Sequence, residues 1–165
     1  MPSPVVLIGL MGSGKSTVGP RLAGRLGLPF ADNDAILLRR SGRTARDIEQ
    51  SEGFDALHRA EADALLEALR TPAVIAAAAG AVPEPDVARA LRGAEVVYLR
   101  ADPDVLAGRL LHDDGYRPIG RDPHELLREQ FRQRDDAYRA VASLVVDATA
   151  PVDDIVERII SAVAP

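Results

Sequence analysis

The chain has 165 residues, of which 47% are hydrophobic and 27% are charged, and this composition excludes a disordered or fibrous protein. Its length is typical of a single domain, which we expect over residues 1–165. The net charge of −5 argues against a nucleic acid or a membrane as partner, because both attract concentrated positive charge. The absence of cysteine excludes disulfides and fits the cytoplasm, where we expect a monomer.

Short apolar runs alternate with longer helical patterns, and this alternation is typical of an α/β fold. Because the runs are apolar on both faces, they predict a five-stranded parallel sheet with helices on both faces. The predicted strands are 5–8, 29–31, 73–77, 95–99 and 144–147. The predicted helices are 15–26, 35–41, 45–52, 55–69, 85–91, 103–111, 125–142 and 152–163. Between them, the glycine- and charge-rich segment 112–124 predicts a mobile loop.

A glycine-rich motif follows the first predicted strand. Residues 9–16 read Gly-Leu-Met-Gly-Ser-Gly-Lys-Ser, which matches the P-loop pattern of nucleotide-binding proteins. Glycines let backbone N–H groups approach phosphate oxygens, and the next helix adds positive potential at its N-terminus. We expect Lys15 to reach the β- and γ-phosphates of ATP and Ser16 to offer its hydroxyl to Mg²⁺. The expected nucleotide-binding residues are Gly12, Ser13, Gly14, Lys15, Ser16 and Thr17.

The lysine of this motif is unusual in the composition. The chain has 20 basic residues, and Lys15 is the only lysine among them. Arginine is larger, planar and differently hydrated, so it does not replace a compact ammonium inside a phosphate loop. A turn that merely connects a strand to a helix would not explain why the single lysine lies here, and we interpret the motif as a nucleotide site.

Two aspartates, Asp32 and Asp34, follow the second predicted strand. The carboxyl ends of parallel strands line the ligand crevice, so both carboxylates are expected to face the phosphates. One would hold Mg²⁺ through water and the other would accept the proton of a substrate hydroxyl. The alternative is that Asp34 only caps the helix predicted to begin at residue 35.

A third candidate is Arg117, which precedes Pro118 within the irregular segment. An arginine on a lid can neutralise the charge that develops on a transferring phosphoryl group, while closure of the lid excludes water. We therefore interpret residues 112–124 as a lid and Arg117 as a catalytic residue.

Taken together, these motifs resemble the shikimate kinases, a family of small P-loop kinases. The resemblance implies a substrate-binding helical segment at about 32–62, a lid at about 112–124, and transfer of the γ-phosphoryl group of ATP to the 3-hydroxyl of shikimate with Mg²⁺. The matching segments are 9–17, 30–34, 41–43, 47–48, Gly53, Glu61, 74–75, 80–82, 96–99, 117–118, and Arg134 ahead of Tyr138.

The resemblance also implies roles for individual residues. Those roles are phosphate binding for Lys15, metal binding for Ser16 and Asp32, acceptor-hydroxyl binding for Asp34, the lid arginine for Arg117, and substrate contacts for His58, Gly80 and Arg134.

The chain departs from the family pattern mainly at the acceptor site. The family motif Gly-Glu-x-x-Phe-Arg-x-x-Glu reads Gly-Phe-Asp-Ala-Leu-His-Arg-Ala-Glu over residues 53–61. His58 therefore stands where half of a carboxylate clamp is expected, and Arg59 lies about 100° further around the helix. The family's triple glycine is Ala78-Ala79-Gly80. These departures leave two alternatives open, a kinase for a related polyol or cyclitol and a non-catalytic ATP-binding paralogue.

Overall fold

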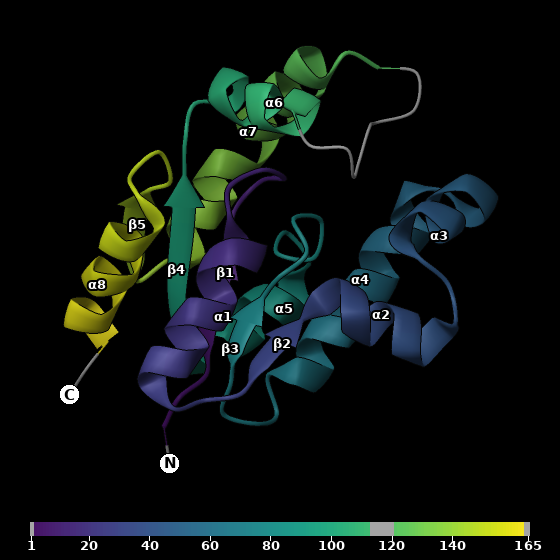
Figure 1. Ribbon diagram of the computed structural model, residues 1–165. Helices are drawn as coiled ribbons and strands as arrows, with labels where there is room; N and C mark the ends of the chain where they lie inside the picture. Colours follow the sequence, from purple (N-terminus) through teal and green to yellow (C-terminus); the bar gives the residue numbers. More distant parts are fainter. Residues whose placement is uncertain (1, 113–120, 164–165) are drawn as a thin grey trace.

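The computed structural model describes residues 2–112 and 121–163. Within this part of the chain, five strands form one parallel sheet in the order β2-β3-β1-β4-β5 (Figure 1). The predicted α/β class and the parallel sheet are confirmed. The strands are β1 (Val5–Ile8), β2 (Phe30–Asp32), β3 (Val74–Ala76), β4 (Glu95–Arg100) and β5 (Leu144–Asp147).

Helices connect the strands and extend beyond the sheet on two sides. Helices α1 and α8 pack against each other, whereas α2, α3 and α4 form one group and α6 and α7 another. In Figure 1 these two groups flank the loop that follows β1. The helices are α1 (Lys15–Leu26), α2 (Asn33–Ser41), α3 (Ala45–Glu52), α4 (Phe54–Ala68), α5 (Pro85–Ala90), α6 (Pro103–His112), α7 (Pro123–Val141) and α8 (Val152–Val163), with a short 3₁₀ turn, Leu91–Gly93, after α5.

The predicted start of α2 is wrong, because a side chain caps this helix earlier than expected. Helix α2 begins at Asn33, two residues before the prediction, because the Asp32 carboxylate accepts a hydrogen bond from the backbone N–H of Asp34. Helix α3 begins as predicted, at a capping box in which Thr44 and Asp47 exchange hydrogen bonds. The cap is therefore Asp32, and the alternative that assigned it to Asp34 is wrong.

The central strand, β1, is the most enclosed part of the sheet. It pairs with β3 on one side and β4 on the other, and all four of its residues are buried. Burying such apolar side chains contributes roughly 1.5–3 kcal/mol each. The glycine-rich loop therefore follows a strand that is buried and paired on both sides.

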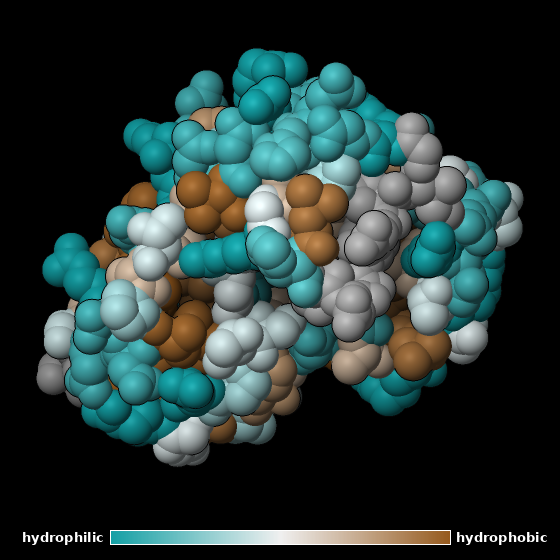
Figure 2. All heavy atoms as spheres, turned by 45° about the horizontal axis from the view of Figure 1, so that its top comes forward, coloured by the Kyte–Doolittle hydropathy of each residue, from teal (hydrophilic) through white to brown (hydrophobic). Residues whose placement is uncertain are grey.

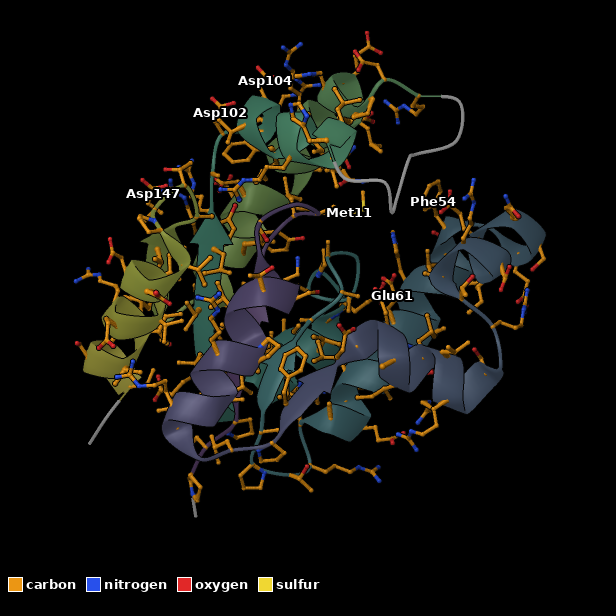
Figure 3. All side chains as sticks on the ribbon, in the orientation of Figure 1. Met11, Phe54, Glu61, Asp102, Asp104 and Asp147 are labelled. Carbon is orange, nitrogen blue, oxygen red and sulfur yellow. The ribbon has the colours of Figure 1, made fainter. Side chains whose placement is uncertain are left out.

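The strands all end at one edge of the sheet. Asp102 and Asp147 lie close to the ends of β4 and β5 there, and Met11 lies in the loop after β1 (Figure 3). No helix within residues 2–112 and 121–163 is long and apolar enough to cross a membrane. The edge of the sheet where the strands end is the expected place for a ligand in an open parallel sheet.

Candidate active site

A cleft of about 920 Å³ opens at this edge of the sheet. Its lining comes from the glycine-rich loop, from α2 and α4, and from α7 across the opening. In Figure 2 hydrophobic residues lie among hydrophilic ones on this face of the molecule, and hydrophilic residues dominate its upper margin. The cleft joins the predicted nucleotide-binding residues to the predicted acceptor residues. Those that line it are Gly12, Ser13, Gly14, Lys15, Ser16, Thr17, Asp32, Asp34, His58, Gly80 and Arg134.

The loop after β1 has a backbone that only glycine accommodates at its first position. Gly9 has a φ of +153°, and a Cβ atom there would lie 2.7 Å from the carbonyl oxygen of Leu99. Gly14, with a φ of +97°, ends the loop and starts α1 in a left-handed conformation. The loop thus curls over the N-terminus of α1, whose free backbone N–H groups attract anions.

Lys15 lies folded across this loop. Its Nζ atom donates hydrogen bonds to the carbonyl oxygens of Gly9, at 2.6 Å, and Leu10, at 3.1 Å. Burial lowers the pKa of Lys15 to about 8, and the nearby carboxylates of Asp34 and Asp32 oppose this shift. At pH 7 the ammonium therefore remains charged, in a position from which it can turn toward phosphate oxygens.

The next two side chains, Ser16 and Thr17, lie in the first turn of α1. Both are exposed, whereas Ser13 in the loop is buried. A hydroxyl and the free N–H groups of a helix N-terminus are hydrogen-bonding partners for phosphate or for the ligand shell of a cation. Their position agrees with the nucleotide-binding role predicted for this segment.

Asp34 faces the phosphate loop from the first turn of α2. Its side chain is exposed to the cleft on one side, but the cleft walls remove much of its hydration. This desolvation and the negative charge of Asp32 raise the pKa of Asp34, whereas Lys15 lowers it. A carboxylate with a raised pKa is a better proton acceptor than an ordinary aspartate.

The far wall of the cleft combines His58 and Glu61 of α4 with Gly80. A Cβ atom on Gly80 would lie 2.4 Å from His58 Cδ2 and 2.8 Å from Glu61 Oε2. Burial and the positive charge of Arg134 lower the pKa of His58, which favours the neutral form of this side chain. The wall is therefore close-packed, and both of its titratable side chains lie against the glycine.

Arg134 supplies positive charge to the same wall from α7. Among the residues that the structure describes, it forms no ion pair, and the adjacent carboxylate of Asp135 binds Arg100 and Arg139. An unneutralised guanidinium in a cleft is a ready partner for a carboxylate of a ligand.

Arg59, the residue next to His58, points away from the cleft. Its guanidinium forms ion pairs with Asp63, Glu84 and Asp86 on the outer surface of α4 and α5. The helix does not shift its register to bring this arginine into the site. The prediction that Arg59 lies on another face of the helix is confirmed.

Residues 78 and 79 form the backbone wall beside Gly80. The carbonyl oxygen of Ala79 accepts a hydrogen bond of 2.7 Å from the hydroxyl of Tyr138, a buried residue of α7. This contact fixes the segment after β3 against α7, the helix that carries Arg134. Ala78 and Ala79 both line the cleft, as the sequence predicts.

We expect that replacing Gly80 with alanine weakens binding of the acceptor. The added methyl group would displace His58 and the buried Glu61, and overpacking of this kind destabilises a fold by about 1–3 kcal/mol. The Michaelis constant for the acceptor should rise at least about 10-fold, with that for ATP unchanged. Gly93→Ala is the matched control, because nothing lies within 4 Å of its Cβ position. An unchanged Michaelis constant for the acceptor in Gly80→Ala would contradict the close packing of His58 and Glu61 against this glycine.

Two site features escaped the sequence analysis. Glu61 matched the family pattern without a role, yet it is buried in the cleft wall. Arg109 donates hydrogen bonds to the carbonyl oxygens of Gly12, at 3.0 Å, and Ala148, at 2.7 Å, and so links the phosphate loop to the segment after β5. Because Arg109 and Gly12 are far apart in the sequence, no local pattern predicts this contact.

The lid prediction is not tested by the structure. Arg117 and the predicted lid residues 113–120 lie outside the described residues.

A comparison with known protein families identifies the family of the chain. The family model "Shikimate kinase" matches residues 11–164. The chain belongs to the shikimate kinase family. A shikimate kinase of Paracidovorax citrulli is 41% identical over 146 residues, which span 85% of this chain and 79% of the relative.

Solved structures agree with the family. The shikimate kinase of Acinetobacter baumannii in complex with shikimate has a TM-score of 0.90 and 29% identity, over 98% of this chain and 93% of that one. A gluconokinase of Sinorhizobium meliloti has a lower TM-score, 0.72, with 28% identity over 99% of this chain and 92% of that one. The fold is therefore shared with kinases of more than one small hydroxylated acceptor.

Proposed function

We propose that this protein is a shikimate kinase, which transfers the γ-phosphoryl group of ATP to the 3-hydroxyl of shikimate and forms shikimate 3-phosphate and ADP. The observation that carries the proposal is one cleft in which a phosphate loop faces Asp34 and Arg134, and Arg134 forms no ion pair within residues 2–112 and 121–163. Phosphoryl transfer to an acidic acceptor needs a loop that binds the phosphates of the donor and, in the same cleft, groups that bind the hydroxyl and the carboxylate of the acceptor. The A. baumannii relative, a shikimate kinase in complex with shikimate, supports this acceptor.

ATP would bind with its phosphates on the glycine-rich loop. The N–H groups of Gly12, Gly14 and Ser16 and the ammonium of Lys15 offer positive potential at this place. When a phosphate group approaches, Lys15 exchanges its hydrogen bonds to the loop carbonyls for phosphate oxygens. This movement compensates the negative charge that the γ-phosphoryl oxygens carry during transfer.

The side chains beside the loop also fit a Mg²⁺ ion. Ser16 has an exposed hydroxyl, and Asp32 uses only one of its carboxylate oxygens to cap α2. No group of three acidic, histidine or cysteine side chains converges in the described residues, which suits an ion held by few protein ligands together with nucleotide phosphates. We propose Ser16 and Asp32 as these ligands; the ion would neutralise phosphate charge.

Asp34 would act on the acceptor hydroxyl. The hydroxyl oxygen forms a bond to the γ-phosphorus as the bond from that phosphorus to the bridging oxygen of ADP breaks. The hydroxyl proton passes to the Asp34 carboxylate and then to solvent. Positioning of the acceptor by Arg134, with Gly80 allowing close approach to the wall, would set the geometry of this step.

The test is an assay of ADP release by the purified protein with shikimate and with a panel of polyols, cyclitols and gluconate. Formation of shikimate 3-phosphate, identified by ³¹P NMR, with the highest kcat/KM for shikimate supports the proposal. Turnover of another alcohol without turnover of shikimate would overturn the assignment of shikimate as the acceptor. ATP binding without transfer to any member of the panel would overturn the activity.

The second candidate is a kinase for a related polyol. Neutral His58 and the methyl groups of Ala78 and Ala79 favour it, because they remove a cation from the acceptor wall and narrow that wall. Arg134, however, keeps a carboxylate-binding cation in the cleft, and the geometry favours an acidic acceptor. The cytoplasmic location, the monomeric state and a substrate-binding segment at about 32–62 within one domain over 1–165 remain part of the proposal.

We expect His58→Arg to tighten the binding of shikimate. A guanidinium beside Arg134 would complete a two-sided clamp, and a charge-assisted hydrogen bond contributes about 1.5–3 kcal/mol, or roughly 10- to 100-fold in affinity. Calorimetry with shikimate measures the change directly. Ser161→Arg is the control, because Ser161 is exposed on α8 and lies outside the cleft. An unchanged affinity in His58→Arg would place the acceptor carboxylate elsewhere.

A further inference from the structure

Glu61 is a buried acid in the wall of the cleft. Its side chain comes from the middle of α4 and lies between that helix and the phosphate loop in Figure 3, and only 7% of the residue is exposed. Within the part of the chain that the structure describes, Oε2 has no hydrogen-bond partner and no cation lies within ion-pair distance. The backbone is fixed, because Asn33 Nδ2 donates to the carbonyl oxygen of Glu61 at 3.1 Å. A carboxylate in such a place is costly unless it is protonated or meets a ligand.

The charged groups around Glu61 come from four other elements. Asp34 of α2 and Glu49 of α3 are negative, and Lys15 of α1 and Arg134 of α7 are positive; His58 lies on the same helix. Burial is the largest influence and raises the pKa of Glu61 to about 8, helped by Asp34 and Glu49 and opposed by Arg134 and Lys15. At pH 7 the carboxyl group is therefore mostly neutral and carries a proton.

Arg134 and the proton of Glu61 lie at the same wall of the cleft, where both can contact a ligand. A substrate carboxylate that binds Arg134 enters the wall formed by His58, Glu61 and Gly80. An ionised Glu61 would repel it, whereas a protonated carboxyl group would donate to it. Hydrogen bonds from a neutral acid to a carboxylate are short and among the stronger ones in proteins.

We propose that Glu61 is protonated in the free enzyme and donates a hydrogen bond to the carboxylate of the bound acceptor, as the neutral partner of Arg134. Glu61 thereby replaces the second cation that His58 does not supply, and it selects acidic acceptors over neutral polyols. The inference rests on the proposed function, because it takes shikimate as the acceptor. It assigns to Glu61 a contact with the substrate.

The main test compares wild type, Glu61→Gln and Glu61→Ala by steady-state kinetics between pH 6 and 9.5. Lys15 titrates in the same range, so the informative quantity is the ratio of the shikimate KM of wild type to that of Glu61→Gln. We expect a ratio within about 3-fold of 1 at pH 6.5 that rises about 10-fold by pH 9, because glutamine donates at every pH and a group with a pKa near 8 does not. Glu61→Ala should raise KM for shikimate about 10- to 100-fold at pH 7 without changing KM for ATP.

Glu67→Gln is the matched control, because Glu67 lies on α4 outside the cleft and pairs with Arg39 and Arg40. Its kinetics should follow those of wild type at every pH. Loss of shikimate binding in Glu61→Gln equal to that in Glu61→Ala at pH 7, or a KM ratio independent of pH, would overturn the proposal.

A second measurement does not depend on the acceptor. The folded-state pKa of Glu61 lies above its unfolded value, so the stability that its protonation contributes is present at low pH and is lost as pH rises through about 8. Without substrate, the Tm of wild type should therefore fall relative to that of Glu61→Gln between pH 5 and 8. A constant difference would overturn the protonated state. The two experiments can also disagree. If the Tm changes as expected but the protein does not phosphorylate shikimate, Glu61 is protonated, whereas the proposed function and the contact with the acceptor are overturned.

Discussion

Replacing Lys15 with arginine is expected to lower kcat for phosphoryl transfer by at least about 10²–10³-fold while the fold stays intact. The loop encloses the ammonium, which reaches the carbonyl oxygens of both Gly9 and Leu10. A forked guanidinium is too large to occupy this place and cannot reproduce a point charge beside the γ-phosphate. The loss of one donor to a charged transition state has an effect of this size. Measurement of ADP release with saturating shikimate and ATP tests the expectation.

The control for this variant is Arg21→Lys. Arg21 lies on the exposed side of α1 and pairs with Asp153, so exchange of its cation should leave kcat and KM close to those of wild type. Equal Tm values for the three proteins would show that the loss is not one of folding. Near-normal transfer by Lys15→Arg would contradict the assignment of the glycine-rich loop.

Replacing Asp34 with asparagine is expected to lower kcat about 10²–10⁴-fold, with a smaller change in KM for ATP. Asparagine has nearly the same shape and can still bind the acceptor hydroxyl, but it cannot accept the proton as the new bond to phosphorus forms. The raised pKa of Asp34 adds a second expectation. Protonation of this group should make wild-type kcat fall on the acidic side of the pH profile, and this fall should be absent from the residual activity of Asp34→Asn.

Asp63→Asn is the matched control for Asp34→Asn. Asp63 lies on the outer face of α4, where it pairs with Arg59, and its replacement should leave kcat unchanged. If Asp34→Asn kept more than about a tenth of the wild-type kcat, proton acceptance by Asp34 would not limit transfer. The role of this aspartate would then be confined to binding the acceptor.

The phosphate loop is predictable because its determinants are local. The apolar strand 5–8, the glycines and the lone lysine all lie within twelve residues, and the structure forms strand, loop and helix where the pattern predicts them. The start of α2 was predicted wrongly, and the cause is again local. Both Asp32 and Asp34 suit a helix cap, and the sequence does not indicate which carboxylate turns back to the backbone.

The acceptor wall is harder to predict because it forms by tertiary packing. Glu61 looks like a polar position of an amphipathic helix, and only the approach of α2 and of the segment after β3 buries it. By contrast, helical geometry alone predicted that Arg59 would not substitute for His58, and this is confirmed by its ion pairs on the outer surface. The register of one helix could thus be predicted, whereas the surroundings of each side chain could not.

The central place of β1 has a consequence for how the protein is made. This strand leaves the ribosome before its partners β3 and β4, which begin only at Val74 and Glu95. The strand before the phosphate loop therefore has no partner until residue 76 has been synthesised and lacks its second partner until residue 100, and it is exposed meanwhile. Pairing over such long sequence separations slows folding and leaves apolar segments open to aggregation. Substitutions at Val6 or Leu7 should consequently reduce the yield of soluble protein during expression more than they reduce the activity of the molecules that fold.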